Sequence, residues 1–146
     1  MRNWSGTVNF RDSEFASPSS IAEVQSLVAS SANIRARGSA HCFNEIADTS
    51  AIAISLEELS NEIKIDKDKR TVRVPAGMKY GELAVALHER GWAIHNMASL
   101  PHISVAGAVA TATHGSGVGN GNLATAVKSL EVVLPDGSLQ LSLIHI

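Results

Sequence analysis

One stretch of the chain, residues 99–121, consists mainly of Gly, Ala, Ser and Thr and carries no charged side chain. Small residues let a backbone approach a ligand closely, and glycine adopts backbone angles that other residues avoid. Where such a segment begins a helix, its exposed N–H groups can bind phosphate oxygens. The same composition also fits a tightly packed helix, so this stretch alone leaves both interpretations open.

A second stretch of this kind lies upstream, where residues 37–44 read Arg-Gly-Ser-Ala-His-Cys-Phe-Asn. The preceding segment, residues 34–37, is predicted as a short strand that runs directly into a loop at Gly38 and Ser39. Two loops of small polar residues in one chain favour a ligand-binding site over a packed helix.

The composition excludes several classes of function. The 146 residues suit one domain, and 45% of them are hydrophobic, which is enough for a core. A net charge of −2 and an aromatic content of 4% argue against binding to nucleic acid or an anionic membrane. The single cysteine, Cys42, fits a reducing compartment, so a cytoplasmic protein is expected.

Hydrophobic periodicity predicts a mixture of helices and strands. A capping box at Ser20 and Glu23 begins a helix over about residues 20–31, and a second helix over 80–90 ends at Gly91. Strands are predicted where apolar residues alternate or run together, namely in 4–15 (with Val8 and Phe10), in 51–56, in a hairpin over 63–74, and in 128–134 after a helical turn at 123–127. These elements do not alternate regularly, which indicates an α+β fold, and a subdomain boundary is expected near Pro75.

The last residues are expected to be foreign to the protein. Pro135-Asp136-Gly137 predicts a turn whose return strand should continue. Residues 141–146 instead back-translate to a transposase adapter used in sequencing libraries. The native sequence is therefore expected to end at about Gln140, which makes the chain a fragment.

Three motifs together resemble one family. Residues 38–48, 96–107 and 113–119 occur in the order found in the flavin-binding half of the alditol oxidases, including xylitol oxidase, which are relatives of the aldonolactone oxidases. The resemblance covers residues 3–138. It implies the two-subdomain α+β FAD-binding domain of the vanillyl-alcohol oxidase (PCMH) type, truncated at the C-terminus, with subdomains over about 1–75 and 76–140.

The resemblance also implies which residues hold FAD. In the family the first loop wraps the diphosphate, and its histidine, here His41, is joined covalently through a ring nitrogen to the flavin 8α carbon. His114 is open to two interpretations, a flavin contact or a packing residue that orients its loop. The implied cofactor contacts are Arg37, Gly38, Ser39, Ala40, His41, Cys42, Ser99, Ser104, Gly107, Thr111, Ala112, Thr113 and His114.

Two residues depart from the family pattern. Relatives usually carry Gly and Ser where this chain has Ala40 and Cys42. If the backbone at this glycine has a positive φ, alanine costs on the order of 1 kcal/mol there. A thiol is also a weaker donor than a hydroxyl, so one contact to the cofactor is expected to weaken.

The function implied by the resemblance is oxidation of a CH–OH group of an alditol or sugar-like polyol. A hydride passes to flavin N5, and oxygen is the acceptor and yields hydrogen peroxide. The polyol-binding and catalytic groups are expected in a C-terminal domain, so none is assigned here, and a monomer is expected. The alternatives are an aldonolactone oxidase or dehydrogenase and a non-catalytic nucleotide-binding module. The spacing of the histidines His41, His95, His102 and His114 does not predict a metal site, and His88, His102 and His145 are predicted to be structural or without a role.

Overall fold

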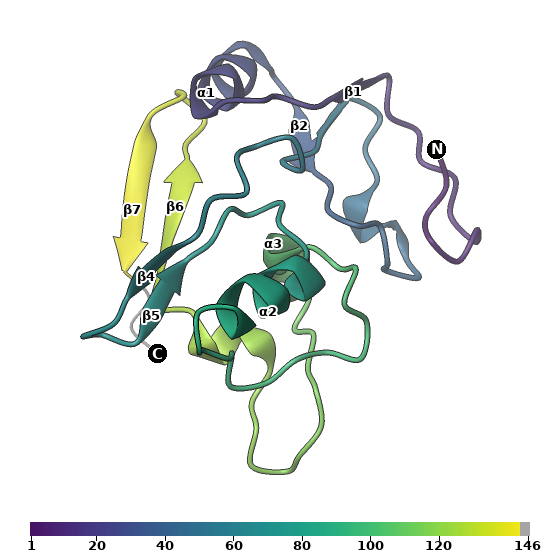
Figure 1. Cartoon of the computed structure of the whole chain (residues 1–146). Coiled ribbons are helices and arrows are strands. Elements are labelled where there is room, and N and C mark those ends of the chain that lie inside the picture. The colour runs from purple at the N-terminus through teal and green to yellow at the C-terminus, as the bar shows by residue number, and fades with distance from the viewer. Residues whose placement is uncertain (144–146) are drawn as a thin grey trace. The chain divides into compact units, whose positions relative to one another are not determined.

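The computed structural model describes residues 1–143; His145 and the last part of the expected foreign tail lie outside them. The chain divides into two compact units (Figure 1). Unit 1 comprises residues 1–59 together with the segment from residue 127 onward, and unit 2 comprises residues 60–126. By this division Pro75, where the sequence predicted a subdomain boundary, lies inside unit 2.

A three-stranded parallel sheet forms the centre of unit 1. Its order is β1 (Glu14–Ala16), β3 (Ile52–Ile54), β2 (Ile34–Ala36), so β3 is the middle strand. Ala53 has no exposed surface and Ile54 is almost fully buried, which confirms the strand predicted within 51–56 to be buried on both faces.

Helix α1 (Ile21–Ser30) begins where the capping box predicted. The Ser20 hydroxyl accepts a hydrogen bond from the Glu23 N–H at 3.3 Å. The Glu23 carboxylate, however, accepts from the N–H of Ser19 at 2.8 Å, one residue earlier than the predicted partner. The first bond satisfies an N–H group that a helix start leaves without an intrahelical partner, and the second ties the residue before the N-cap to the first turn.

The strand predicted around Val8 and Phe10 is wrong. Residues 1–10 fold back on themselves, with the Asn3 N–H donating to the Val8 carbonyl at 3.0 Å and a turn at Gly6, whose φ is 74°. Residues 2 and 9 form only an isolated bridge. The first strand begins later, at Glu14, because the earlier residues pair with their own turn instead of with a sheet.

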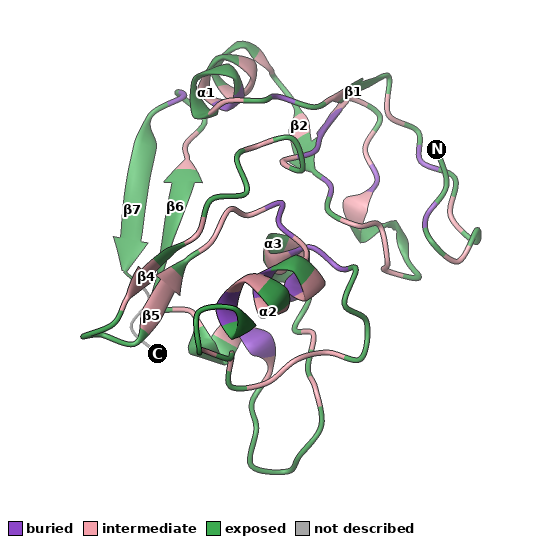
Figure 2. Cartoon of the chain, in the orientation of Figure 1, coloured by how far each residue is buried: buried purple, intermediate pink, exposed green. Residues whose placement is uncertain are grey.

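A hairpin of β6 (Ser129–Val133) and β7 (Leu139–Leu143) completes unit 1, as the turn residues predicted. Gly137 has a φ of 81°, and its carbonyl accepts from the Gln25 side chain of α1 at 2.7 Å. A Cβ at Gly137 would lie 3.0 Å from that of Ala29. The hairpin turn therefore packs closely on α1, whereas β7 is exposed along its whole length (Figure 2).

Unit 2 is built around α2 (Tyr80–His88), which is the predicted second helix. The hairpin of β4 (Lys64–Asp66) and β5 (Thr71–Arg73) packs apolar side chains such as Ile65 and Val72 against this core. This packing explains why the hairpin belongs to unit 2. Tyr80, the first residue of α2, is part of this core, and its burial raises the pKa of its hydroxyl group. The buried core consists of Met78, Tyr80, Leu83, Leu87, Ile103, Ala108 and Leu123.

The remaining elements are short. Unit 1 contains the 3₁₀ helix η1 (Glu45–Ala47). Unit 2 contains α3 (Val105–Ala110) and the 3₁₀ helix η2 (Leu123–Ala126), which confirms the helical turn predicted near residue 123.

A buried ion pair joins β2 to the segment before β1. The Arg37 guanidinium, whose side chain has no exposed surface, donates to the Asp12 carboxylate at 2.7 Å. Its carbon also lies 3.8 Å from the centroid of the Phe10 ring, and the Arg37 N–H donates to the Ile54 carbonyl at 2.9 Å. The charge is thus compensated by a carboxylate and by the face of an aromatic ring. The hydrogen bond from Arg37 holds the pKa of Asp12 below its usual range.

Replacing Asp12 with asparagine should destabilise unit 1 and reduce its sensitivity to acid. Because the folded-state pKa is lowered, the pair stabilises the protein at neutral pH, and this stability is lost as the pH falls through that pKa. We expect Asp12→Asn to cost about 2 kcal/mol at neutral pH. The variant should also lose less stability than the wild type between about pH 6 and about pH 3. Thermal unfolding across this range measures both effects.

Asp68→Asn, at an exposed position in the β4–β5 turn, is the matched control and should behave as the wild type does. An Asp12→Asn variant with unchanged neutral stability and the full acid loss would contradict the importance of the pair.

Candidate flavin-binding site

The loop of residues 38–42 follows β2 directly, as predicted, and is held from the N-terminus of the chain. The Trp4 N–H donates to the Ala40 carbonyl at 2.9 Å, and the Asn3 side-chain amide donates to the Cys42 carbonyl at 2.9 Å. These carbonyls lie on either side of His41. The N-terminal turn therefore fixes the backbone on both sides of the histidine that the resemblance implies is bonded to flavin.

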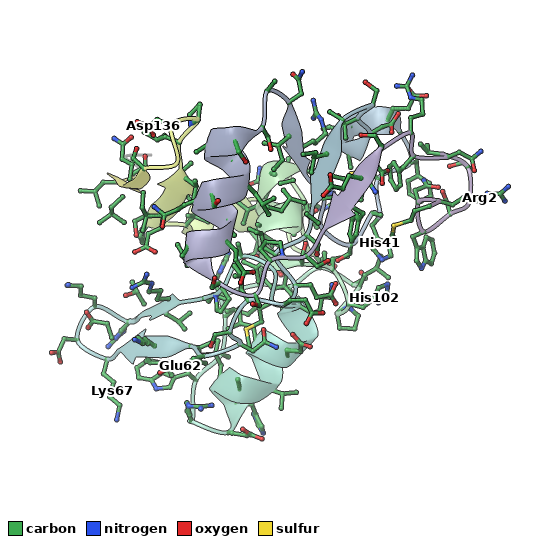
Figure 3. The ribbon with its side chains drawn as sticks, turned by 90° about the horizontal axis from the view of Figure 1, so that it is seen from above. Arg2, His41, Glu62, Lys67, His102 and Asp136 are labelled. Atoms are coloured by element: carbon green, nitrogen blue, oxygen red, sulfur yellow. The ribbon has the colours of Figure 1, made fainter. Side chains whose placement is uncertain are left out.

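The side chain of His41 is half-buried and lies against an aromatic ring. The ring centroids of His41 and Trp4 are 4.9 Å apart, with 31° between the ring planes. Figure 3 shows His41 on the same side of unit 1 as Arg2. Elsewhere in the loop, Gly38 is exposed, and Ser39 and the free thiol of Cys42 are half-buried.

Arg37 was also expected to contact the cofactor, but its guanidinium points into the interior of unit 1. There it pairs with Asp12 and has no exposed surface. Through its side chain Arg37 thus fixes the start of the loop and offers no surface to a ligand.

Ala40 has a φ of 54°, in the left-handed region that favours glycine. The positive φ on which the predicted strain at Ala40 depends is therefore present. Alanine costs on the order of 1 kcal/mol in this conformation, and such strain persists only where the surrounding structure enforces it. The hydrogen bond from Trp4 to the Ala40 carbonyl is one such constraint.

The second stretch is mostly loop, and only α3 within it is helical. Two N–H groups at the start of α3 are already used inside unit 2. That of Val105 donates to the Met78 carbonyl at 2.9 Å, and that of Ala106 donates to the Ala76 carbonyl at 3.0 Å. The expectation that N–H groups at this helix start are exposed to a phosphate is therefore wrong for these two. Ser104 precedes them and is buried.

The end of α3 presents hydroxyl groups. The Thr111 hydroxyl donates to the Gly107 carbonyl at 2.9 Å and lies 3.2 Å from the hydroxyl of Thr113. Ala112, between them, has a φ of 52°. Each of the two stretches implied to hold FAD thus contains one alanine in the left-handed conformation.

The other implied contacts in this stretch lie near the surface. Ser99 and His114 are exposed, and Gly107 is half-buried. The His114 ring nitrogen Nδ1 lies 3.0 Å from the Gly115 carbonyl oxygen of its own loop.

The sequence of residues 13–141 matches the family described as FAD binding domain. The chain belongs to this FAD-binding domain family. FAD is accordingly its cofactor, and the resemblance seen in the sequence is confirmed.

Individual relatives agree with this assignment. The chain is 48% identical over 139 residues to alditol oxidase from a Streptomyces species, covering 93% of this chain and 34% of that protein. It is 33% identical over 141 residues to L-gulono-1,4-lactone dehydrogenase from Mycobacterium tuberculosis, covering 94% of this chain and 33% of the relative. The chain thus spans about a third of the length of these curated relatives.

A solved structure confirms the fold. The crystal structure of cholesterol oxidase from B. sterolicum matches 97% of this chain and 31% of its own, with a TM-score of 0.76 and 20% identity. The predicted α+β class and the PCMH-type FAD-binding fold are therefore confirmed.

The donor groups present in each unit suit FAD, which is rich in phosphate, hydroxyl and amide groups. The loop over residues 114–122 packs tightly against the segment that contains Met97, since a Cβ at Gly115 would overlap the Met97 carbonyl oxygen. Among the described residues, the buried Asn96 Nδ2 and Asn122 Oδ1 atoms have no hydrogen-bond partner within the protein. A polar ligand could satisfy such atoms.

Three residues that shape the first loop, Asn3, Trp4 and Asp12, were not predicted from the sequence. The Asn3 amide contacts a carbonyl 39 positions away in sequence. Local periodicity carries no information about such a pairing. The one indication in the sequence that the N-terminus has a role was Trp4, a tryptophan near a run of small polar residues.

Within residues 1–143, no group of three His, Cys, Asp or Glu side chains could hold a metal ion. Over the same residues, every helix is too short or too polar to cross a membrane.

Substituting Ala40 with glycine should stabilise the FAD-binding domain. Glycine relieves the left-handed strain, and its own entropic cost offsets part of the gain, so we expect about 0.5–1 kcal/mol in the free energy of unfolding. Chemical denaturation measures this change. Ala22→Gly, at an exposed position in α1, is the matched control and should lose about 1 kcal/mol. An Ala40→Gly variant destabilised as much as this control would contradict the strain at Ala40.

Proposed function

We propose that this chain is the FAD-binding part of an oxidase that oxidises a CH–OH group of an alditol or sugar-like polyol. Oxygen is the electron acceptor, and hydrogen peroxide is the second product. The observation that carries this proposal is the 48% identity to an alditol oxidase over 93% of the chain. The other relatives cover the chain equally well at lower identity.

In this proposal, bound FAD supplies the electron chemistry by accepting a hydride from the carbinol carbon at flavin N5. The chain's own residues bind and orient the cofactor. Backbone and small side chains at Gly38, Ser39, Ala40 and Cys42 line the first contact region. The second consists of Ser99, Ser104, Gly107, Thr111, Ala112, Thr113 and His114. Arg37 acts on the first region through the loop that it anchors.

We also propose that His41 holds FAD covalently through a ring nitrogen. An imidazole suits this role because one nitrogen can form the bond while the other is held by the protein. The half-buried position of His41, and the bonds on both sides of its backbone, support a fixed ring.

The groups that bind the polyol and assist its deprotonation belong, in this proposal, to the part of the relatives that this chain does not cover. We further infer a monomeric, cytoplasmic protein. The single cysteine, which fits a reducing compartment, supports the cytoplasmic location.

An aldonolactone oxidase or dehydrogenase is the second candidate function. It is favoured by relatives such as the L-gulono-1,4-lactone dehydrogenase at 33% identity and the mouse L-gulonolactone oxidase at 28% identity. Both candidates use the same FAD-binding domain, so the substrate distinguishes them.

A peroxide assay on the intact FAD-loaded protein tests the function. We expect xylitol or sorbitol to give kcat/KM values at least about tenfold above those for L-gulono-1,4-lactone, equivalent to about 1.4 kcal/mol in transition-state binding. His88→Ala, an exposed change on α2, should leave these values unchanged. Faster turnover of the lactone would favour the second candidate, and a protein that turns over neither substrate would contradict both.

A further inference from the structure

The side chain of Asn3 is buried although it is polar, with only 4% of the residue exposed. Its Oδ1 atom accepts from the Val8 N–H at 2.9 Å, which closes the N-terminal turn. Its Nδ2 group donates to the Cys42 carbonyl at 2.9 Å and also lies within hydrogen-bond distance of the hydroxyls of Ser5 and Thr7. One amide thus makes the turn rigid and joins it to the loop that carries His41.

Trp4 follows directly and is 60% exposed, which is unusual for the largest apolar side chain. Burial in the core therefore does not explain its position. Its backbone N–H donates to the Ala40 carbonyl, and the centroid of its ring lies 4.9 Å from that of the His41 ring. The tryptophan holds the backbone before the histidine and packs against the histidine ring.

Together the two residues fix His41 at three points, which are the carbonyl before it, the carbonyl after it and the face of its ring. Because the loop contains Ala40 in a strained conformation, the backbone around His41 would relax without such restraints. A side chain held in one orientation reacts faster than a mobile one, since the entropy of ordering is already lost.

We propose that Asn3 and Trp4, here called the N-terminal clamp, are positioning residues for the attachment of FAD to His41. This inference rests on the proposed covalent link. In that step a ring nitrogen of His41 bonds to the 8α carbon. One hydrogen leaves the imidazole N–H and one leaves the 8α methyl group, and molecular oxygen accepts both with two electrons to give hydrogen peroxide. The clamp takes no part in these transfers and acts only on the orientation of the ring.

Reconstitution of the intact apoprotein with FAD tests the clamp. Two quantities are measured, the total flavin bound and the rate at which flavin becomes resistant to acid precipitation. We expect Trp4→Leu to bind total flavin within about twofold of the wild type but to attach it about tenfold more slowly or worse. Trp4→Phe keeps an aromatic face and should recover most of the rate. Asn3→Ala should likewise slow the attachment of flavin while total flavin stays within about twofold of the wild type.

Phe43→Leu is the matched control, because Phe43 is an aromatic residue in the same region that is 72% exposed. It should attach flavin at the wild-type rate. A Trp4→Leu variant that attaches flavin as fast as the wild type would overturn the clamp. So would a parallel loss of total flavin and attachment that Trp4→Phe does not rescue, because that pattern indicates a purely structural role.

The wild type and His41→Ala separate this proposal from the one on which it rests. A wild type that attaches flavin, with a His41→Ala variant that does not, confirms the link and leaves the Trp4 comparison to decide the clamp. A wild type that binds flavin but releases all of it in acid overturns the covalent link, and the clamp with it.

Discussion

The ion pair between the buried Arg37 guanidinium and Asp12 is the interaction on which the arrangement of unit 1 depends. Arg37 is the last residue before the His41 loop, and its side chain has no exposed surface. A cation in such a place is tolerated only when its charge and its N–H groups are compensated. Asp12 supplies the counter-charge and Phe10 supplies the face of a ring. Because these partners come from the segment before β1, the pair holds that segment against the residue at which the loop begins.

A second set of contacts acts on the far side of the same loop. Residues 3 and 4 bind the carbonyls that flank His41, so the loop is anchored by charge at its start and by neutral hydrogen bonds beyond it. These anchors hold Ala40 in a left-handed conformation that alanine does not favour. Ala112 has the same conformation in the second stretch. Strain at both places agrees with a general tendency of ligand-binding loops to store it, at some cost in stability.

The sequence predicted those parts of the fold that depend on neighbouring residues. The capping box at Ser20 placed α1, the apolar spacing placed α2, and turn residues placed both hairpins, because each of these signals acts over a few positions. It failed for residues 4–13, where alternation at Val8 and Phe10 suggested a strand, whereas the end of the same predicted segment does lie in β1. The alternation has another origin. Val8 pairs with Asn3 across the N-terminal turn, and the ring of Phe10 packs against the Arg37 guanidinium.

The candidate site was predictable in outline because its loops are rich in glycine and small residues, which local composition reveals. The supporting residues were not predictable in the same way. A lone Asp12 or Asn3 resembles any surface polar residue, and its partner lies 25 or 39 positions away. The resemblance likewise implied that Arg37, beside the glycine loop, contacts the cofactor. Only the pairing with Asp12 shows that the side chain is used inside the unit.

Peptide mapping of the intact protein purified with its flavin tests the central claim most directly. Trypsin cuts after Arg37 and Lys64, so residues 38–64 form one peptide that contains His41 as its single histidine. If the loop positions His41 for FAD, this peptide is heavier by the mass of FAD less two hydrogen atoms, and fragmentation places the addition on His41. If the peptide is found only at its unmodified mass while the protein carries flavin, the account of His41 is contradicted.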